Sequence, residues 1–357
     1  MIFTKGLAKT LETYESWWAG ELDRPILPVV LTGVDPGREP PKHRFEHQKS
    51  YNDVNISPEE LVDSVDYDMQ CLEFIGDAYP YMNTSFVGAG GFAAMLGAKT
   101  KFDGSIWFYV DNELPIEDIH FEYDENNFWL IRIKSIMEIA QQRWGDSVVI
   151  SMPDLGGVFD ILASFRGTQN LLFDLYDSPD EVKRVVDEIK VLWHRCYNEL
   201  TEFMTAGYYT DWSGILSAKR SYMMQSDFCY MLGREMFDEF VLPELADTCA
   251  FLDRGCFHLD GVGQIPFVDS LINIAKVDLI QWIPGDGPHA AGDWFDLYRK
   301  ILDAGIHLQL VYDDGTKNFD KVISHYGTGK RIVRSSQYYP ISKRDEALEF
   351  LSRYGVD

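Results

Sequence analysis

The chain has 357 residues, of which 46% are hydrophobic and 14% aromatic, so it can bury a full core and is too apolar to be disordered. Its formal charge of −25 repels phosphate backbones and anionic lipid head groups, which argues against nucleic-acid and membrane-surface binding. Five cysteines without CxxC spacing fit a reducing compartment, and residues 1–18 carry no signal-like apolar segment, so we expect a cytoplasmic protein without membrane spans.

The N-terminal half alternates between helices and short apolar strands. Ser57 and Pro58, followed by two glutamates, are typical of a helix start, because serine caps the first turn and proline fits its first position. The glycine-rich residues 88–91 lack G-x-G-x-x-G spacing, which favours a close-packed turn over a dinucleotide site. The predicted elements are a helix at 5–19, a strand at 26–32, a helix at 57–75, a strand at 82–87, a β-rich excursion at 101–118, a helix at 125–144 and a strand at 148–151.

The C-terminal half continues this rhythm. Ser178 and Pro179 open a long amphipathic helix. Further elements are predicted as helices at 234–253 and 343–353 and strands at 207–212, 222–227, 256–260, 279–283, 307–312 and 331–334. Strands that alternate with helices throughout favour a (β/α)8 TIM barrel over an open doubly wound sheet. We expect one domain at residues 1–357, with an N-terminal helical and loop extension of about residues 1–24.

The best candidate for a chemical site is the pair His258 and Asp260. The two residues lie two apart at the end of a predicted strand, so both side chains point to one side, which at the top of a barrel is the mouth. An imidazole and a carboxylate can share a divalent metal ion, or the carboxylate can orient the imidazole as a general base. In the structural alternative, Asp260 caps the next turn and His258 is hydrogen-bonded within the core.

Polar and aromatic residues also follow other predicted strands. Asp227, two residues after Gln225, could orient a substrate or cap the turn that follows it. Gln281, Trp282 and Tyr338 could form a substrate-binding wall, although aromatic residues at barrel ends also serve as packing. These residues extend the predicted site around the mouth.

Arg166 lies near Asp160 in the sequence and suits either a clamp for a substrate carboxylate or a helix-surface ion pair. Ser335 is small and polar at the end of the last predicted strand, where a ligand could bind. No Gly-x-Ser-x-Gly, HExxH or P-loop motif occurs, which removes the common signals of serine hydrolases, zincins and nucleotide triphosphatases. Most other histidines fall in predicted loops or on helix surfaces, where we expect them to be solvated, as at His43, His47 and His194.

Three segments carry a family resemblance: Phe159-Asp160-Ile161-Leu162-Ala163 with Arg166-Gly167-Thr168, the helix Glu235-Met236-Phe237-Asp238-Glu239-Phe240-Val241-Leu242-Pro243, and the strand His258-Leu259-Asp260-Gly261. They resemble the uroporphyrinogen decarboxylase superfamily, which includes zinc-dependent methyltransferases that work with methylcobalamin and corrinoid proteins. The Met-Phe-x-x-Phe-Val-x-Pro pattern is the most specific of the three. The resemblance implies a barrel of the uroporphyrinogen decarboxylase type with a funnel-shaped mouth, and a homodimer.

The chain departs from the decarboxylase members of this superfamily. Those members carry an arginine-rich segment after the first strand, which suits a substrate with many carboxylates. Here the corresponding loop has Arg38, Lys42 and Arg44 in a different, proline-broken arrangement. We therefore identify the chain as a divergent member.

The chain also departs from the methyltransferase members, which have His-x-Cys at the fifth strand and a further Cys near the eighth as zinc ligands. This chain has His258-x-Asp260 and, at the other position, Ser335-Ser336. A soft thiolate site is lost, but His258 and Asp260 remain as nitrogen and oxygen ligands for zinc or another divalent ion. Cys256 does not replace the thiolates, because we expect it to lie deeper in the barrel.

Three functions follow as hypotheses. The first is an enzyme acting on a small organic substrate by methyl transfer or demethylation, with a corrinoid partner protein and with His258, Asp260 and Asp227 as catalytic residues. The second is a decarboxylase of a porphyrin-like polycarboxylate, which requires a basic mouth. The third is a non-catalytic barrel that binds a ligand without a metal.

Overall fold

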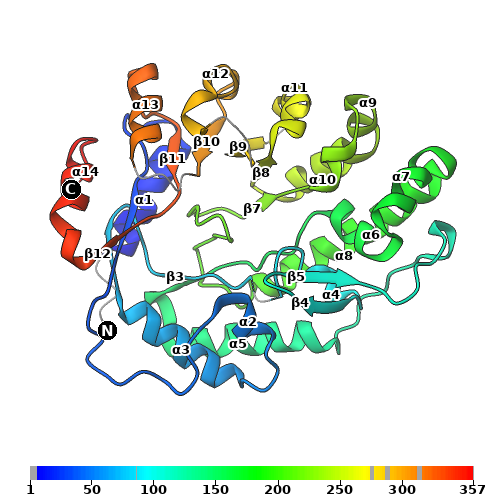
Figure 1. Cartoon of the computed structure of the whole chain (residues 1–357), viewed down its shortest axis with the longest axis horizontal. Coiled ribbons are helices and arrows are strands. Elements are labelled where there is room, and N and C mark those ends of the chain that lie inside the picture. Colours follow the sequence, from blue (N-terminus) through cyan, green and yellow to red (C-terminus); the bar gives the residue numbers. More distant parts are fainter. Residues whose placement is uncertain (1–5, 86, 274–276, 286–289, 312–315, 357) are drawn as a thin grey trace.

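The structure, a computed structural model, describes residues 6–356 apart from residues 86, 274–276, 286–289 and 312–315. In Figure 1 the helices lie around the outside and the strands lie inside, which is the arrangement expected of a parallel α/β protein. The described helices include none that combines the length and the hydrophobicity that crossing a membrane requires.

The described helices are, in chain order, α1 (Leu7–Trp18), α2 (His47–Asn52), α3 (Pro58–Gln70), α4 (Phe92–Met95), α5 (Phe128–Trp144), α6 (Val158–Arg166), α7 (Thr168–Asp177), α8 (Pro179–Thr201), α9 (Arg234–Met236), α10 (Leu242–Phe251), α11 (Val268–Ile272), α12 (Phe295–Asp303), α13 (Lys317–Tyr326) and α14 (Arg344–Ser352). The described strands are β1 (Pro28–Thr32), β2 (Leu72–Gly76), β3 (Tyr81–Met82), β4 (Lys99–Phe102), β5 (Ile106–Tyr109), β6 (Val149–Ile150), β7 (Ser221–Met224), β8 (Arg254–Asp260), β9 (Val277–Ile283), β10 (His307–Leu310), β11 (Ile332–Arg334) and β12 (Gln337–Pro340). The alternation of the two kinds of element follows the prediction closely.

Local signals explain where two of the helices begin. Ser57 caps α3, because its hydroxyl accepts a hydrogen bond from the N–H of Glu60 while the Glu60 carboxylate accepts one from the N–H of Ser57. Helix α8 begins at Pro179, as predicted, and buries one apolar stripe against the rest of the protein. The sequence-predicted starts of both helices are therefore confirmed.

The strands follow one another around the inside in three groups. A parallel sheet has the order β11-β10-β9-β8-β7, a second sheet has the order β12-β1-β2, and β3 pairs in parallel with β6. A parallel bridge between Ile26 and Val333 joins β1 to β11. The N–H of Met152, after β6, donates to the carbonyl of Thr210, before β7. Taken together, this is the strand order of a TIM barrel.

The ring of strands is open between β1 and β3. Strand β1 pairs in antiparallel with β2, from Pro28 opposite Gly76 to Thr32 opposite Leu72. Among the described residues no ladder joins β1 to β3. The expectation of a closed (β/α)8 TIM barrel is therefore corrected: the strand order is as predicted, but β2 takes the edge of β1 that β3 would take in a closed ring.

Four predicted elements differ in detail. The strand predicted at 82–87 is reduced to β3, and the described residues 83–85 and 87 are not part of a strand. The helix predicted at 57–75 ends at Gln70, because the backbone of β2 pairs with β1 instead. The helix predicted at 234–253 is divided by a π-helical turn just before Pro243, which has no N–H for an i→i−4 bond. The strand predicted at 207–212 is reduced to one antiparallel bridge between Tyr209 and Ser217.

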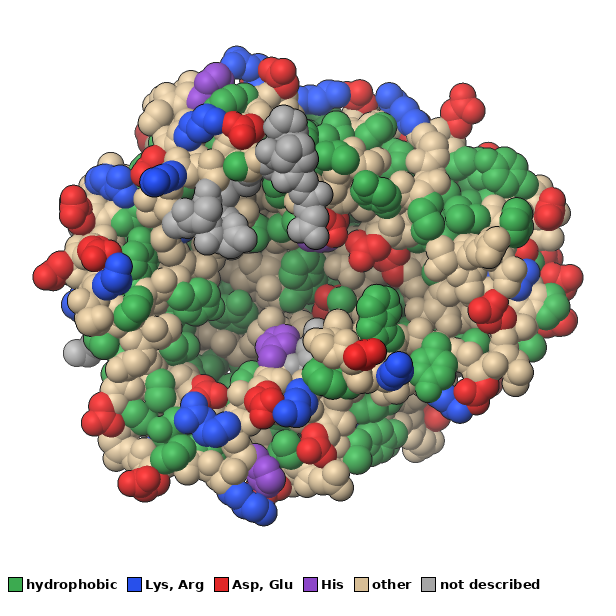
Figure 2. All heavy atoms as spheres, in the orientation of Figure 1, with side chains coloured by type: hydrophobic (Ala, Val, Ile, Leu, Met, Phe, Trp, Pro, Cys, Tyr) green, Lys and Arg blue, Asp and Glu red, His purple; other side chains and the backbone are tan. Residues whose placement is uncertain are grey.

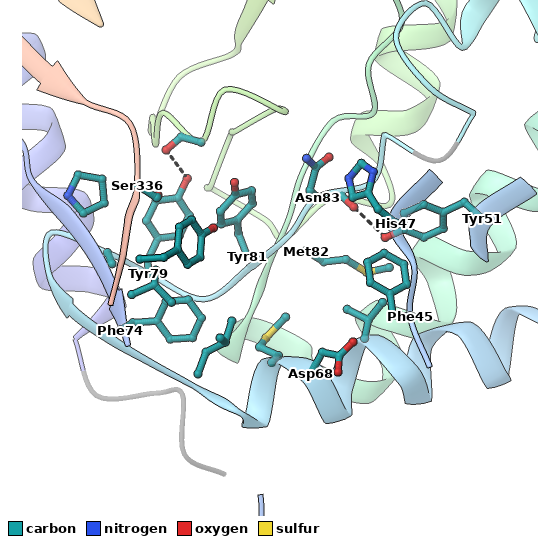
Figure 3. A pocket seen from close by; sticks show the side chains of 18 residues that line it. Phe45, His47, Tyr51, Asp68, Phe74, Tyr79, Tyr81, Met82, Asn83 and Ser336 are labelled. Carbon is teal, nitrogen blue, oxygen red and sulfur yellow. Dashed lines mark hydrogen bonds between the residues drawn. The ribbon is translucent and has the colours of Figure 1, made fainter. Parts of the chain in front are cut away.

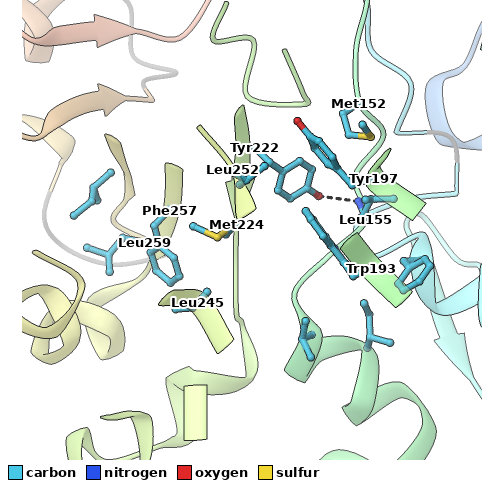
Figure 4. Close-up of a cluster of buried hydrophobic side chains, with 14 of the residues drawn as sticks. Met152, Leu155, Trp193, Tyr197, Tyr222, Met224, Leu245, Leu252, Phe257 and Leu259 are labelled. Carbon is cyan, nitrogen blue, oxygen red and sulfur yellow. Dashed lines mark hydrogen bonds between the residues drawn. The ribbon is translucent and has the colours of Figure 1, made fainter. Parts of the chain in front are cut away.

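The larger apolar core lies between the strands and the helices. Figure 4 shows part of it, where strand residues meet helix residues, including Tyr222, Met224, Phe257, Leu259, Trp193, Tyr197 and Leu245. The hydroxyl of Tyr222 accepts a hydrogen bond of 2.8 Å from the N–H of Leu155, so this buried polar group is paired. The outward-facing strand residues pack in this core, so the inward-facing residues are the ones that can line a site inside the ring.

Helix α1 closes the N-terminal ends of the strands. Tyr14, Trp17 and Trp18 pack against a layer of inward-facing strand residues, namely Ile26, Val149, Met223, Cys256, Leu279 and Val333. The carboxylate of Glu15 pairs with Arg254, the first residue of β8. The predicted N-terminal extension is thus the floor of the ring, and the carboxyl ends of the strands face the mouth. The face shown in Figure 2 is hollowed at its centre, with acidic side chains along the edge.

A substitution at Gly156 tests how closely the loop after β6 must pack. Gly156 has φ +81°, and a Cβ there would lie 2.3 Å from the Cα of Gly90. Gly97 has φ +104°, but nothing lies within 4 Å of its added Cβ. We expect Gly97→Ala to cost about 1–2 kcal/mol of unfolding free energy through the positive φ alone, and Gly156→Ala to cost clearly more. Urea denaturation measures both, and equal losses would contradict the close packing.

Candidate functional site

A polar layer lies directly above the apolar floor. Along β8 the inward-facing residues are Cys256, then His258, then Asp260, because alternate residues of a strand share a face. On β9 and β10 the residues level with His258 are Gln281 and Gln309, which are almost wholly buried. The buried Cys256 belongs to the floor, as predicted.

A chain of hydrogen bonds fixes the proton on His258. Nε2 of Gln309 donates to the carbonyl of Ser213 at 2.9 Å, and Nε2 of Gln281 donates to Oε1 of Gln309 at 2.7 Å. Oε1 of Gln281 is then left to accept a hydrogen bond from Nδ1 of His258. A backbone carbonyl can only accept, so the direction of the whole chain follows from Ser213. His258 therefore carries its proton on Nδ1 when neutral, and its Nε2 lone pair faces the mouth.

Two carboxylates lie near this nitrogen. Nε2 of His258 is 3.7 Å from Oδ2 of Asp260. One ligand atom each from Asp227, His258 and Asp260 lie within 4.8 Å of one another. Of the residues that sequence reasoning assigned to catalysis, all three are thus brought together, and we call them the His258 triad.

The charges of the triad act on the imidazole. Burial would lower the pKa of His258, but the contact with Asp260, the hydrogen bond to Gln281 and the charge of Asp227 outweigh it and raise this pKa above its ordinary value. Burial also raises the pKa of Asp227, and the charge of His258 opposes this rise. The triad therefore stabilises the charged form of the imidazole.

Asp160 holds the backbone that carries Asp227. Its carboxylate accepts hydrogen bonds from the N–H groups of Asp227, at 3.0 Å, and Phe228, at 2.7 Å. The expected partner Arg166 lies elsewhere, since its guanidinium binds the Asp174 carboxylate through two nitrogens. The prediction of Arg166 as a substrate clamp is corrected: the residue forms the ion pair that was its structural alternative.

Further buried carboxyl groups surround the same space. Burial, together with the charge of Asp211, raises the pKa of Asp154 to about 7, while N–H groups of Gly90 and Gly156 and the charge of His258 oppose this. The pKa of Asp211 is also raised by burial. No lysine or arginine of the described residues is among the charges that act on these two groups. Backbone N–H groups satisfy both carboxylates: Asp154 accepts from Gly90 and Gly156, and Asp211 accepts from Ser213 and Met223.

Trp282 does not line the mouth. It lies on the outward face of β9, is fully buried in the larger core and meets the ring of Trp294 at 5.2 Å. Its neighbour Gln281 faces inward, because successive strand residues point to opposite faces. The predicted role of Trp282 as a pocket wall is therefore corrected, and the ring that packs on His258, at 5.2 Å, belongs to Trp212.

The remaining predicted residues lie at different places. Gln225 is buried, and its backbone packs tightly against Gly157. A Cβ added to Gly157 would lie 2.1 Å from the carbonyl oxygen of Gln225. The N–H of Ser335 donates to the carbonyl of Leu310, and the structure brings Ser335 into no contact with the triad among the described residues. Tyr338 lines a separate cavity, shown in Figure 3, and is not part of the triad.

Sequence reasoning missed Gln309, Asp211, Trp212 and His47. Gln309 had a usable signal, because a glutamine between two leucines in a predicted strand points to the face opposite the helices. Asp211 and Trp212 also had a signal, because they end the strand predicted at 207–212, although this segment forms only an isolated bridge. His47 was expected to be solvated, but it lines the cavity of Figure 3.

Comparison with known proteins places the fold but not the family. No protein-family model and no curated protein matches the chain. Among solved structures, the chain resembles a methyltransferase from Methanosarcina mazei with a TM-score of 0.57 and 11% sequence identity, over 95% of this chain and 99% of that chain. At this identity the likeness shows a shared fold with a methyltransferase.

Removing Gln309 tests the hydrogen-bond chain. In Gln309→Leu the amide of Gln281 loses the acceptor that orients it, so we expect neutral His258 to become a mixture of tautomers, whereas the wild type holds the proton on Nδ1. Nitrogen-15 NMR of the imidazole measures this. Gln142→Leu, on the exposed face of α5, is the control. A wild-type signal with the proton on Nε2 would overturn the assignment.

Replacing Asp154 tests its burial through the pH dependence of stability. The folded pKa of about 7 lies above the ordinary 3.8, so stability is fully present below pH 3.8 and is lost as pH rises through 7. Asp154→Asn keeps the acceptor but cannot ionise, so its advantage over wild type should increase by roughly 3 kcal/mol between pH 5 and pH 8. Urea denaturation in EDTA measures this. The exposed Asp177→Asn is the control, and parallel behaviour of the two variants would refute the expectation.

Proposed function

We propose that the protein is an enzyme that transfers a methyl group to or from a small organic substrate at the mouth of the ring, with one divalent metal ion held by the His258 triad. The observation that carries this proposal is the convergence of Asp227, His258 and Asp260 within 4.8 Å, with Nδ1 of the imidazole bound to Gln281 so that Nε2 is the nitrogen available to a metal ion. The fold shared with a methyltransferase supports the reaction class.

The donor set fits a metal with nitrogen and oxygen ligands. Two ligands of one zinc ion, each at about 2.0–2.2 Å, lie at most about 4.4 Å apart, so the triad needs only small side-chain movements to close around an ion. Thiolates are not within reach, because Cys256 is buried in the floor, where burial raises its pKa well above its ordinary value. The ion is therefore zinc or another divalent ion that accepts imidazole and carboxylates.

The residues divide the work between binding and orientation. The Gln281–Gln309 chain holds the imidazole, and Asp160 holds the backbone of Asp227. A divalent ion would supply a Lewis acid that stabilises the charge left on the heteroatom of the substrate when the methyl group departs. In this proposal a corrinoid on a partner protein exchanges the methyl group with the substrate. The enzyme is a homodimer, as the family resemblance implies.

The acidic surroundings disfavour the decarboxylase hypothesis. A porphyrin-like substrate with many carboxylates needs a basic mouth, whereas the carboxyl groups that interact with His258 are Asp154, Asp227 and Asp260. A carboxylate of this group that is ionised would repel a substrate carboxylate, by roughly 4 kcal/mol at 4 Å with an effective dielectric constant of 20. We therefore do not propose it.

Metal titration and a methyl-transfer assay test the proposal. We expect purified protein to bind one zinc or manganese ion, and to demethylate methylcobalamin in the presence of a thiol, phenol or amine acceptor. His258→Ala and Asp260→Asn should weaken metal binding and lower the rate by about 100-fold or more, because each removes one ligand of the triad. Calorimetry and the absorbance of the corrinoid measure the two effects.

The exposed histidine His120, which contacts Glu188, provides the control variant His120→Ala. It should change neither metal binding nor rate. If elemental analysis and titration both show no metal, and metal-free protein is equally active, the proposed role of the triad is wrong. If the protein binds a ligand without a metal and without turnover, and His258→Ala leaves that affinity unchanged, the protein is a ligand-binding barrel.

A further inference from the structure

We propose that the cavity beside the opening between β1 and β3 binds the body of the substrate, and that this body is an uncharged aromatic ring. The inference rests on the proposed function, since it names a substrate class for the same mouth. The cavity, of about 320 Å³, is drawn in Figure 3 and falls within the size range of small-molecule sites.

The cavity exists because β2 displaces β3 from the edge of β1. Pro28 and Val30 of β1 line it from one side, and Tyr81 and Met82 of β3 line it from the other. Pro28 and Val30 lie on the same face of the strand as Ile26, which belongs to the floor, so the cavity opens from the inside of the ring. A closed barrel would place a strand ladder there.

Aromatic and methionine side chains from separate elements form about half of the wall. Those labelled in Figure 3 include Phe45, Tyr51, Phe74, Tyr79 and Tyr81. Flat rings pack against a flat ligand in offset-stacked or edge-to-face geometry, each such pair contributing about 0.5–1.5 kcal/mol beyond area burial. Sulfur atoms from methionine adapt to the remaining space. The wall thus suits a planar apolar body.

The cavity offers no counter-charge for an anion. Neither lysine nor arginine is among its described lining residues, and burial lowers the pKa of His47, so that imidazole is neutral at pH 7. A free carboxylate for a cation is also missing there, because Asp68 already pairs with Arg44 at 2.8 Å. Desolvating a charged ligand without a partner costs several kcal/mol, so a neutral ligand is favoured.

The hydroxyl of Tyr81 is placed to orient such a ring. Tyr51 donates to the carbonyl of Asn83, and Tyr79 donates to the carbonyl of Gly214. No hydrogen bond involves the Tyr81 hydroxyl among the described residues, and burial raises the pKa of this group, so it stays protonated. It can donate one hydrogen bond to an oxygen on the ligand.

A short loop connects the cavity with the triad. Gly214 lines the cavity, Ser213 ends the hydrogen-bond chain of Gln309, and the ring of Trp212 packs on His258. This run of three successive residues therefore reaches from the cavity to His258. A substituent of a ring bound in the cavity would extend past this loop toward the metal ligands.

A matched set of probes tests the ligand class in metal-free protein in EDTA. The probes are 4-methoxyphenol, which is neutral, 4-methoxybenzoate, an anion, and (4-methoxyphenyl)trimethylammonium, a cation. We expect calorimetry to show that 4-methoxyphenol binds at least tenfold more tightly than either charged probe. Tighter binding of the anion or the cation, or no binding of the neutral probe, would overturn the inference.

Two variants test the location. Ser336→Trp fills the cavity and should abolish binding of 4-methoxyphenol, and Tyr338→Ala, which removes an exposed part of the wall, should weaken it by about tenfold. Because Tyr338 is exposed, this variant keeps the test decisive if Ser336→Trp does not fold. Tyr176→Ala, on the outer surface of α7, is the control and should leave binding unchanged. Unchanged binding in both cavity variants would refute the location.

The two proposals fail separately. His258→Ala should still bind 4-methoxyphenol in metal-free protein, because the cavity does not use the imidazole. Binding of the probe by a protein that takes up no metal would refute the metal proposal and support the cavity. Metal uptake without binding of the neutral probe would support the metal proposal and refute the cavity proposal.

Discussion

The antiparallel pairing of β1 with β2 is the constraint on which the layout of the mouth depends. A strand edge must have its N–H and C=O groups paired, and β2 pairs those of β1 from Pro28 to Thr32. Strand β3 consequently stays with β6, and the ring is left open between β1 and β3. The cavity with its aromatic wall lies at this opening, so a local choice of pairing partner determines where the cavity forms.

The second constraint is the direction of the hydrogen bonds that end at Ser213. A backbone carbonyl accepts only, so Gln309 and Gln281 must each donate in turn, and the imidazole of His258 must donate through Nδ1. Nε2 of His258 then lies 3.7 Å from Oδ2 of Asp260, and the charges of Asp260 and Asp227 act on the imidazole. The ring thus has a floor of apolar residues below and carboxylates above, and the proposed metal ion and the proposed aromatic substrate would bind side by side in the mouth.

The sequence allowed the central site to be found because it depends on short-range geometry. His258 and Asp260 share a face for the simple reason that alternate residues of a strand do so, and the structure brings them together with Asp227. By the same rule Trp282, which follows the inward-facing Gln281, points outward into the core and not into the mouth. Arg166 was expected near Asp160, but Asp174, two turns along the chain, offers it a closer carboxylate.

The sequence by itself determined most of the succession of helices and strands, the place of Cys256 below His258 and the spacing of His258 and Asp260, because periodicity and capping act within a few residues. Only the tertiary structure decided that β2 pairs with β1, that Gln309 completes the chain to His258, and that Trp212 packs on its ring. These depend on which distant segments meet. Loop closure costs little more for one distant partner than for another, so the choice rests on packing and hydrogen-bond pairing in the folded state.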